Sequence, residues 1–202
     1  MTTGRGRLVL LVSGNGSNLQ AILDACSSGR LDAEVVGVVS NRPDAYALDR
    51  AKAAGVPTLV APHQGRDRVA YDQDLAYTVA SFGPDLVVLA GWNRLLTSHF
   101  LAHHITINLH PAKPGAFPGL GAIEAAYEAW RGGDVTEGGV MVHYVPDEGV
   151  DDGPVILTEA VPFEPGDSLV SYEKRVHAVE HRLLVEAIAT VLATSEVTPR
   201  RA

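Results

Sequence analysis

Short aliphatic runs alternate with helically spaced apolar residues over the first half of the chain. Continuous aliphatic runs predict buried strands at 8–12, 35–39, 86–90 and 105–109, and a weaker strand is expected at 58–60. Apolar residues at helical spacing predict helices at 19–27, 45–54, 67–82 and 97–103. Continuous apolar strands, unlike alternating ones, are typical of a parallel sheet that is covered on both faces. The order of elements therefore predicts a doubly wound, mostly parallel α/β sheet.

After residue 110 the pattern changes. A loop with three prolines and three glycines spans 111–121, and a helix is predicted at 123–130. Two apolar segments at 140–145 and 155–161 are joined by the acidic turn 146–153, and so short a reversal predicts an antiparallel strand pair. Apolar residues along one face then predict a long helix at 168–193. Because no linker or internal repeat divides the chain, we expect a single domain over residues 1–202.

Composition limits the possible functions. The formal net charge of −8 disfavours binding to the DNA or RNA backbone, which requires a basic surface. The one cysteine, Cys26, excludes an intrachain disulfide and a metal site built from several cysteines. The sequence has no apolar run of about 18–20 residues that could cross a membrane, and its first residues lack the apolar segment of a signal peptide. We therefore expect a cytoplasmic protein without nucleic-acid or membrane partners.

A glycine-rich turn follows the first predicted strand. Residues Gly14-Asn15-Gly16-Ser17-Asn18 lie between that strand and the next helix. Glycines allow the backbone to approach a ligand and to adopt positive φ, and the N–H groups and dipole at a helix start favour a phosphate. The same residues could form an ordinary tight turn in which Ser17 or Asn18 caps the helix. Turn chemistry and the position in the sheet favour the phosphate site.

The turn matches the known nucleotide-binding motifs only in part. Leu19 stands where a dinucleotide site has its third glycine or alanine, and the second strand ends at Ser40-Asn41-Arg42 without the acid that binds the ribose of NAD. Arg42 could contact the 2′-phosphate of NADP, so an NADP-binding oxidoreductase stays open, as does a nucleotide-binding module without catalytic activity. No lysine follows the glycines as in a P-loop. A mononucleotide or a sugar phosphate fits better.

Polar residues at the end of the strand at 105–109 form a second candidate site. Asn108 and His110 alternate with apolar residues, so their side chains point to the same side at the carboxyl end of the strand. An amide N–H can stabilise an oxyanion, and an imidazole can move protons near neutral pH. This combination suits acyl transfer, and the alternative is a capping asparagine beside a solvated histidine.

Three further groups of polar residues are weaker candidates. The acidic turn at 147–154 could supply a carboxylate that orients the imidazole, although most of its charges are expected to be solvated. His177 and Glu180 are three residues apart on the last helix and could face either the glycine turn or solvent. The histidines between 99 and 110 lack the spacing of a metal site, and no metal is expected.

Four segments, in order along the chain, resemble a known family: 12–22, 84–96, 107–111 with 117–119, and 150–156. They are similar to the folate-dependent formyltransferases of purine synthesis, the glycinamide ribonucleotide (GAR) transformylase or phosphoribosylglycinamide formyltransferase family. The resemblance covers nearly the whole chain. It implies a Rossmann-like formyltransferase fold, with a nucleotide-phosphate-binding half at 7–110 and a folate-binding and C-terminal half at 111–195.

The resemblance also implies an activity. A formyl group would pass from 10-formyltetrahydrofolate, a cosubstrate, to the amine of 5′-phosphoribosylglycinamide by direct attack of the amine, with no metal. The products would be formylglycinamide ribonucleotide and tetrahydrofolate, and the enzyme would be a monomer or a homodimer.

Roles for individual residues follow from the same resemblance. The catalytic residues would be Asn108, His110 and Asp151, of which Asp151 is placed by aligning the following Gly153-Pro154 pair with the family. The phosphate and ribose of the substrate would be bound by Gly16, Ser17, Asn18, His177 and Glu180. The folate would be bound by Arg68, Asn93, Arg94, Leu95, Leu96, Asn108, Asp147, Glu148, Gly149, Val150 and Asp151.

Two related activities are alternatives. Methionyl-tRNA formyltransferase shares the catalytic segment but carries a tRNA-binding domain, and formyltetrahydrofolate hydrolase carries an N-terminal regulatory domain. Neither additional domain is expected here. The chain also departs from the family in the loop at 112–116, where the family often has Ser-Leu-Leu-Pro, and in an acidic turn one residue longer than in some relatives.

Overall fold

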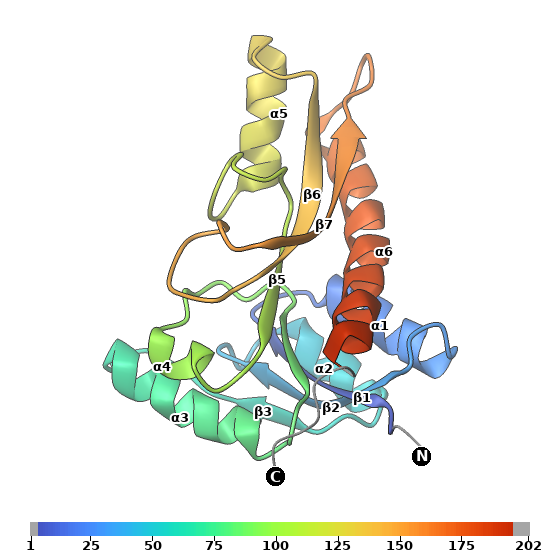
Figure 1. The fold of residues 1–202 in the computed structure, drawn as a ribbon. Helices are drawn as coiled ribbons and strands as arrows, with labels where there is room; N and C mark the ends of the chain where they lie inside the picture. Colours follow the sequence, from blue (N-terminus) through green and yellow to red (C-terminus); the bar gives the residue numbers. More distant parts are fainter. Residues whose placement is uncertain (1–3, 196–202) are drawn as a thin grey trace.

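The computed structural model describes residues 4–195, and the remaining ends of the expected domain, 1–3 and 196–202, lie outside this range. A seven-stranded sheet has the strand order β3-β2-β1-β4-β5-β6-β7 (Figure 1). Its strands are β1 (Gly6–Val12), β2 (Ala33–Ser40), β3 (Thr58–Val60), β4 (Leu86–Leu89), β5 (Thr106–His110), β6 (Glu137–Tyr144) and β7 (Val155–Pro162). The helices are α1 (Ser17–Ser27), α2 (Tyr46–Ala53), α3 (Arg68–Ala80), α4 (Ser98–Leu101), α5 (Ala122–Gly132) and α6 (Leu169–Ser195).

The first five strands form the parallel part of the sheet, with β1 between β2 and β4. Leu8 and Leu10 of β1 belong to a hydrophobic core shared with α1, α2 and α6. Val9 and Leu11 of the same strand belong to a second core on the other face, shared with α3 and α4. All four side chains are fully buried. Because both faces are covered, the strand is apolar at every position from Leu8 to Val12, and the predicted doubly wound sheet is confirmed.

Two further strands extend the sheet in the antiparallel sense. β7 pairs with β6, as predicted, and β6 also pairs antiparallel with β5. In Figure 1 these strands and α5 rise away from the parallel part, and α6 runs along both parts. Phe163 stacks between Trp130 and Tyr172, with ring centroids 4.9 and 3.9 Å away, and so joins α5 to α6. Neither α6 nor any other helix among residues 4–195 is long and apolar enough to cross a membrane.

The start of α1 differs from the prediction in a way that matters for the site. The helix begins at Ser17, and Gly16 is its N-cap residue, in the left-handed region at φ 77° with no side-chain cap. The alternative in which Ser17 or Asn18 caps the helix is therefore wrong, because both residues lie inside its first turn. The backbone N–H groups of that turn have no partner within the helix and are available to an acceptor from outside.

Candidate active site

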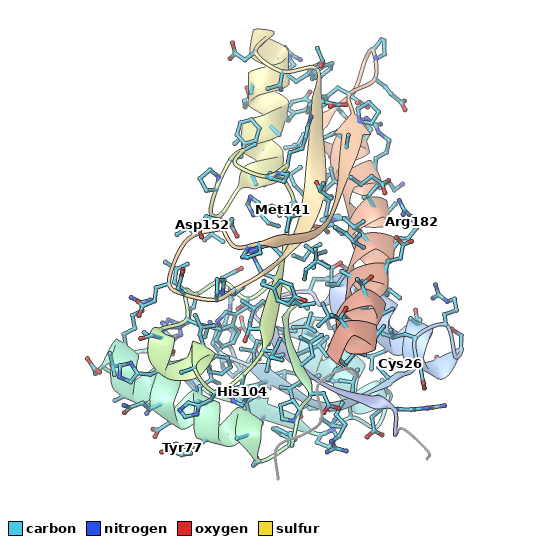
Figure 2. All side chains as sticks on the ribbon, in the orientation of Figure 1. Cys26, Tyr77, His104, Met141, Asp152 and Arg182 are labelled. Carbon is cyan, nitrogen blue, oxygen red and sulfur yellow. The ribbon has the colours of Figure 1, made fainter. Side chains whose placement is uncertain are left out.

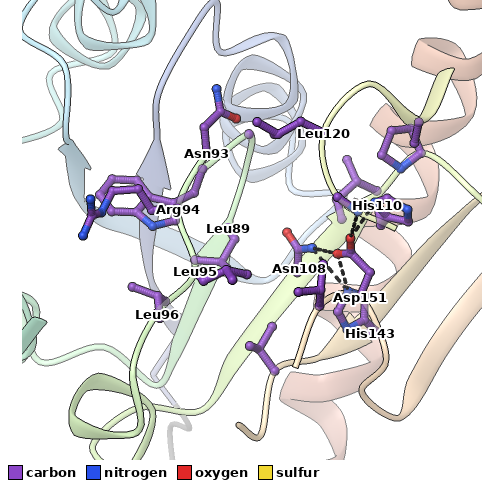
Figure 3. Close-up of a pocket in the computed structure, with 18 of the residues that line it drawn as sticks. Leu89, Asn93, Arg94, Leu95, Leu96, Asn108, His110, Leu120, His143 and Asp151 are labelled. Carbon is purple, nitrogen blue, oxygen red and sulfur yellow. Dashed lines mark hydrogen bonds and ion pairs between the residues drawn. The ribbon is translucent and has the colours of Figure 1, made fainter. Parts of the chain in front are cut away.

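A cleft of about 520 Å³ opens at the carboxyl ends of β4 and β5 and at the start of α1. This is the edge of a doubly wound sheet at which ligands bind. The loop after β4 forms one wall, and the end of β5 with the turn between β6 and β7 forms the other (Figure 3). The predicted site residues that line the cleft are Asn18, Asn93, Arg94, Leu95, Leu96, Asn108, His110, Asp147, Gly149, Val150, Asp151, His177 and Glu180.

The carboxylate of Asp151 is the centre of the polar cluster in this cleft. Its Oδ1 accepts a hydrogen bond from Asn108 Nδ2 at 3.0 Å, and its Oδ2 lies 3.3 Å from His110 Nδ1. The backbone N–H of Gly119 donates to Oδ2 at 2.8 Å. Figure 3 shows the three side chains converging from β5 and from the acidic turn. The structure therefore brings together Asn108, His110 and Asp151, which are 43 residues apart at most.

Several opposing effects act on the Asp151 carboxyl. Burial raises its pKa, but the hydrogen bond with His143, the N–H of Gly119 and the charges of the two histidines outweigh burial and hold the pKa below its ordinary value. The group is thus a carboxylate at neutral pH. Asp151 also has φ 52°, in the left-handed region. This conformation is uncommon outside glycine, and the four polar partners of the side chain stabilise it here.

Both ring nitrogens of His110 face acceptors. Nδ1 faces Asp151, and Nε2 lies 3.0 Å from the carbonyl oxygen of Phe117, which is itself at positive φ. A neutral imidazole has only one N–H, so the doubly protonated ring is the form that satisfies both contacts. The side chain is buried, with 4% of its surface exposed. A protonated His110 would be a cation beside the Asp151 carboxylate and could donate a proton or a hydrogen bond.

His143 is a fourth member of the cluster, and the sequence analysis missed it. It lies opposite Asn108 in the β5–β6 register. Its Nε2 is 3.2 Å from Asn108 Nδ2 and 3.5 Å from Asp151 Oδ1, and its Nδ1 is 2.8 Å from the carbonyl oxygen of Tyr144. The one available signal was a histidine within the predicted apolar strand at 140–145. Its meaning depended on the pairing of β5 with β6, which was not predicted.

The glycine turn and α6 form the other end of the cleft. Asn18 lines the cleft, and its buried Oδ1 has no hydrogen-bond partner in the part of the chain that the structure describes. Glu180 also lines the cleft; it is 4% exposed, and its Oε2 lies 2.7 Å from His177 Nδ1. This contact with Glu180 raises the pKa of His177. Gly16 and Ser17 are not among the lining residues of this cleft, and Ser17 lines a neighbouring pocket.

Arg68 and Glu148, both predicted to contact folate, are not among the lining residues of the cleft. Arg68 Nη2 lies 3.1 Å from Glu148 Oε2, so the two side chains pair with each other. Glu148 Oε1 also accepts the N–H of Ser98 at 3.0 Å, and this hydrogen bond lowers the pKa of Glu148. The pair ties the acidic turn to α3 and α4.

Outside this cleft, the histidine-rich segment has a structural role. His104 lies beside α3 and α4 (Figure 2). Its Nε2 is 3.0 Å from the carbonyl oxygen of Ala76, and its ring packs near Phe100. Among residues 4–195 there is no group of three histidine, cysteine or acidic side chains placed to hold a metal ion. The Asp151 cluster, with Asn108, His110 and His143, therefore holds the polar side chains of the cleft that are best placed to take part in a reaction.

Comparison with known proteins gives a consistent result. The sequence profile of the Formyl transferase family matches residues 6–188. The phosphoribosylglycinamide formyltransferase of Schizosaccharomyces pombe is 43% identical over 206 residues, which cover 94% of this chain and 98% of the relative. The enzyme of the same name from Escherichia coli is 42% identical over 179 residues, 87% of this chain and 82% of the relative.

Solved structures agree with the sequence matches. Glycinamide ribonucleotide transformylase 1 from Symbiobacterium toebii superposes with a TM-score of 0.85 at 42% identity, covering 93% of this chain and 88% of that chain. Phosphoribosylglycinamide formyltransferase from Bacillus halodurans superposes with a TM-score of 0.87 at 34% identity, covering 96% of this chain and 100% of that chain. The fold and its order of elements are therefore those of these enzymes.

Proposed function

The chain belongs to the Formyl transferase family, and we propose that it transfers the formyl group of 10-formyltetrahydrofolate to the amine of phosphoribosylglycinamide in purine biosynthesis. The family and the kind of enzyme predicted from the sequence are confirmed by relatives named phosphoribosylglycinamide formyltransferase, which match over most of their length. The observation that carries the chemical proposal is the Asp151 cluster, because it presents an imidazole paired with a carboxylate, and an amide, at the cleft.

The two substrates would enter the cleft from different ends. The phosphate would bind the N–H groups at the start of α1, where Gly16, Ser17 and Asn18 form the turn. Glu180 would accept hydrogen bonds from the ribose hydroxyls, since its buried carboxylate lies at the same end. The folate would lie between the loop Asn93–Leu96 and the acidic turn at 147–151, with its carboxylates near Arg68. The reacting amine and formyl group then meet beside Asn108 and His110.

The reaction needs an oxyanion to be stabilised and protons to be moved. The amine attacks the formyl carbon, a C–N bond forms and the carbonyl oxygen becomes negative. The N–H groups of Asn108 and of the His110 imidazolium stabilise this oxyanion. The oxyanion then re-forms the carbonyl as the bond from carbon to N10 of the folate breaks. His110 donates its proton to N10, and the proton lost by the attacking amine returns to His110. Asp151 would orient His110 and stabilise its protonated form before and after this transfer.

The formyl oxygen must take a place that the protein itself now occupies. In the structure His110 Nε2 faces the Phe117 carbonyl, and Asn108 Nδ2 donates to Asp151. Substrate binding would exchange the Phe117 carbonyl for the formyl oxygen at Nε2. Asn108 Nδ2 also lies 3.2 Å from His143 Nε2, so one of its N–H groups would turn from His143 to the formyl oxygen. The His110 ring thus remains paired with Asp151 on one side and with an acceptor on the other.

The alternatives are not favoured by the family match. Arg42, which would have contacted the 2′-phosphate of NADP, is exposed and pairs with Asp44 at 2.9 Å. A hydrolase of 10-formyltetrahydrofolate would use the same cluster but would need no amine. A cytoplasmic location and a monomeric or homodimeric state stay predictions.

The test is an assay of tetrahydrofolate release from 10-formyltetrahydrofolate, with and without phosphoribosylglycinamide. We expect release only when both substrates are present, together with formylation of the amine. Release that does not depend on the amine would overturn the proposal in favour of a hydrolase. A thermal shift with NADPH alone, and none with a folate analogue, would favour the oxidoreductase.

A further inference from the structure

Arg50 of α2 reaches across to the glycine turn from outside the cleft. Its Nε donates to the backbone carbonyl of Asn15 at 2.9 Å, and its Nη2 donates to the side-chain Oδ1 of the same residue at 3.0 Å. A third nitrogen, Nη1, lies 3.4 Å from Gln20 Oε1 on α1. The guanidinium also lies over the ring of Tyr46, 4.8 Å from its centroid. Arg50 therefore contacts the turn and the first helix at once.

We propose that Arg50 is a positioning residue that orients the Asn15–Gly16 peptide so that the turn presents N–H groups, and no carbonyl oxygen, to the substrate phosphate. This inference rests on the proposed function, which places the phosphate at this turn. A peptide unit is planar and trans, so the carbonyl of Asn15 and the N–H of Gly16 point in opposite directions. By holding the carbonyl on its own side, Arg50 directs the Gly16 N–H to the other side.

The orientation of this peptide is decisive for an anion. Reversal of the peptide would bring a carbonyl oxygen toward the phosphate, and two negative groups would then face each other. With the carbonyl bound to a guanidinium, the N–H of Gly16 can join those at the start of α1. The planar fork of arginine suits two acceptors on one residue, and the lysine ammonium does not reproduce it.

The packing of α2 supports the same function. The N–H of Ala47 donates to the carbonyl of Gly14 at 3.1 Å. A Cβ on Gly16 would lie 2.6 Å from the Cβ of Ala47, so α2 touches the turn at residues 14, 15 and 16. Ala47 is fully buried, whereas Arg50 is only half-buried. Replacing Arg50 therefore leaves the packing of Ala47 against the turn in place. A substitution of Arg50 can then test the orientation of the Asn15–Gly16 peptide apart from the stability of the fold.

The experiment compares Arg50→Met with Lys52→Met, a variant of the same helix that also loses one positive charge. Lys52 pairs with Asp49 at 3.6 Å, and within residues 4–195 no hydrogen bond or ion pair joins its side chain to the turn. For Arg50→Met we expect a KM for phosphoribosylglycinamide and a calorimetric Kd for ribose 5-phosphate about tenfold higher, with kcat and the folate KM within about twofold of wild type. Lys52→Met is expected to keep all four values, and Arg50→Lys to recover only part of the loss.

Each other outcome counts against the inference. Unchanged phosphate affinity in Arg50→Met, full recovery in Arg50→Lys, or an equal loss in Lys52→Met would overturn it, because the fork would then have no specific effect. A drop in kcat with unchanged KM would place Arg50 in a different role and would also overturn it. Should Arg50→Met unfold, Arg50→Lys carries the test through its ribose 5-phosphate Kd. Failure of the wild-type protein to formylate the amine contradicts the proposed function and is read separately.

Discussion

The two ends of the cleft are built from different parts of the polypeptide. At the phosphate end the expected donors are backbone N–H groups, and their placement depends on the left-handed Gly16 and on α2. At the proposed catalytic end the expected donors are the side chains of Asn108 and His110, and both face a single carboxylate. The first end should therefore be sensitive to backbone conformation and the second to the loss of single functional groups. Substitutions at the two ends should affect binding and turnover separately.

The largest effect is expected at the catalytic end. His110→Ala removes an oxyanion donor and a proton carrier, and kcat should fall by about 10²- to 10³-fold. Binding of phosphoribosylglycinamide, measured by calorimetry, should change little because the phosphate end is intact. His104→Ala is the control, since that histidine lies outside the cleft near Ala76. If His110→Ala turned over at nearly the wild-type rate, the proposal that this end of the cleft carries out the reaction would be contradicted.

Gly16→Ala is the corresponding change at the phosphate end. The alanine has to adopt φ 77°, and its Cβ would lie 2.6 Å from the Cβ of Ala47. The free energy of unfolding should therefore fall by about 1–3 kcal/mol. The KM for phosphoribosylglycinamide should rise as the turn shifts. Gly29→Ala is the matched control, because Gly29 has φ 73° and a Cβ there would have no atom of residues 4–195 beyond its chain neighbours within 4 Å. If both variants bind substrate equally well, the backbone of the turn does not form the phosphate site.

A smaller effect is expected at the edge of the folate wall. Arg68→Met removes the cation that pairs with Glu148, and a folate carboxylate would lose a charge-assisted contact. The KM for 10-formyltetrahydrofolate should rise by about three- to tenfold with kcat unchanged, because such contacts at an exposed site are modest. Arg66→Met, which removes an arginine paired with Asp74, is the control. Equal folate KM values in the two variants would exclude a specific contact of Arg68 with folate.

The smallest effect is a pH dependence of stability at α6. Because Glu180 raises the pKa of His177 in the folded protein, the pair stabilises fully below the unfolded pKa of about 6.5 and loses this effect as pH rises through the folded pKa. The advantage of the wild type over His177→Gln should shrink between pH 6 and pH 8, by a few tenths of a kcal/mol, since the histidine is partly exposed. Urea unfolding at both pH values measures it, and an advantage that grows with pH would contradict the pairing.

Local patterns predicted most of the fold because the strands of the parallel part are buried on both faces. The start of α1 was placed two residues late for a definite reason. The apolar period begins at Leu19, whereas the first helical hydrogen bond joins the N–H of Gln20 to the carbonyl of Gly16. The strand β6 begins at Glu137, but the prediction started it at residue 140, because Gly138 and Gly139 locally disfavour a strand. A side chain at Gly138 would overlap the Tyr172 hydroxyl, so tertiary packing requires the glycine.

The candidate catalytic site was predictable only in part. Strand alternation was enough to place Asn108 and His110 on one side. No local pattern distinguishes Asp151 from Asp147 or Asp152, and only the resemblance to the family placed it. Its position depends on the left-handed backbone at residue 151 and on the N–H of Gly119, both of which are tertiary features. His143 was missed because the pairing of β5 with β6 brings it to the site.

The most direct test concerns the carboxylate that joins the cluster. Asp151→Asn keeps the shape of the side chain and removes its charge, so Asn108 and His110 lose their common partner. Single-turnover formyl transfer at saturating substrates should slow by about 10²-fold, with the affinity for phosphoribosylglycinamide unchanged. Asp152→Asn, one residue further along, should react at the wild-type rate. Transfer by Asp151→Asn as fast as by Asp152→Asn would contradict the assignment of this cluster as the catalytic centre.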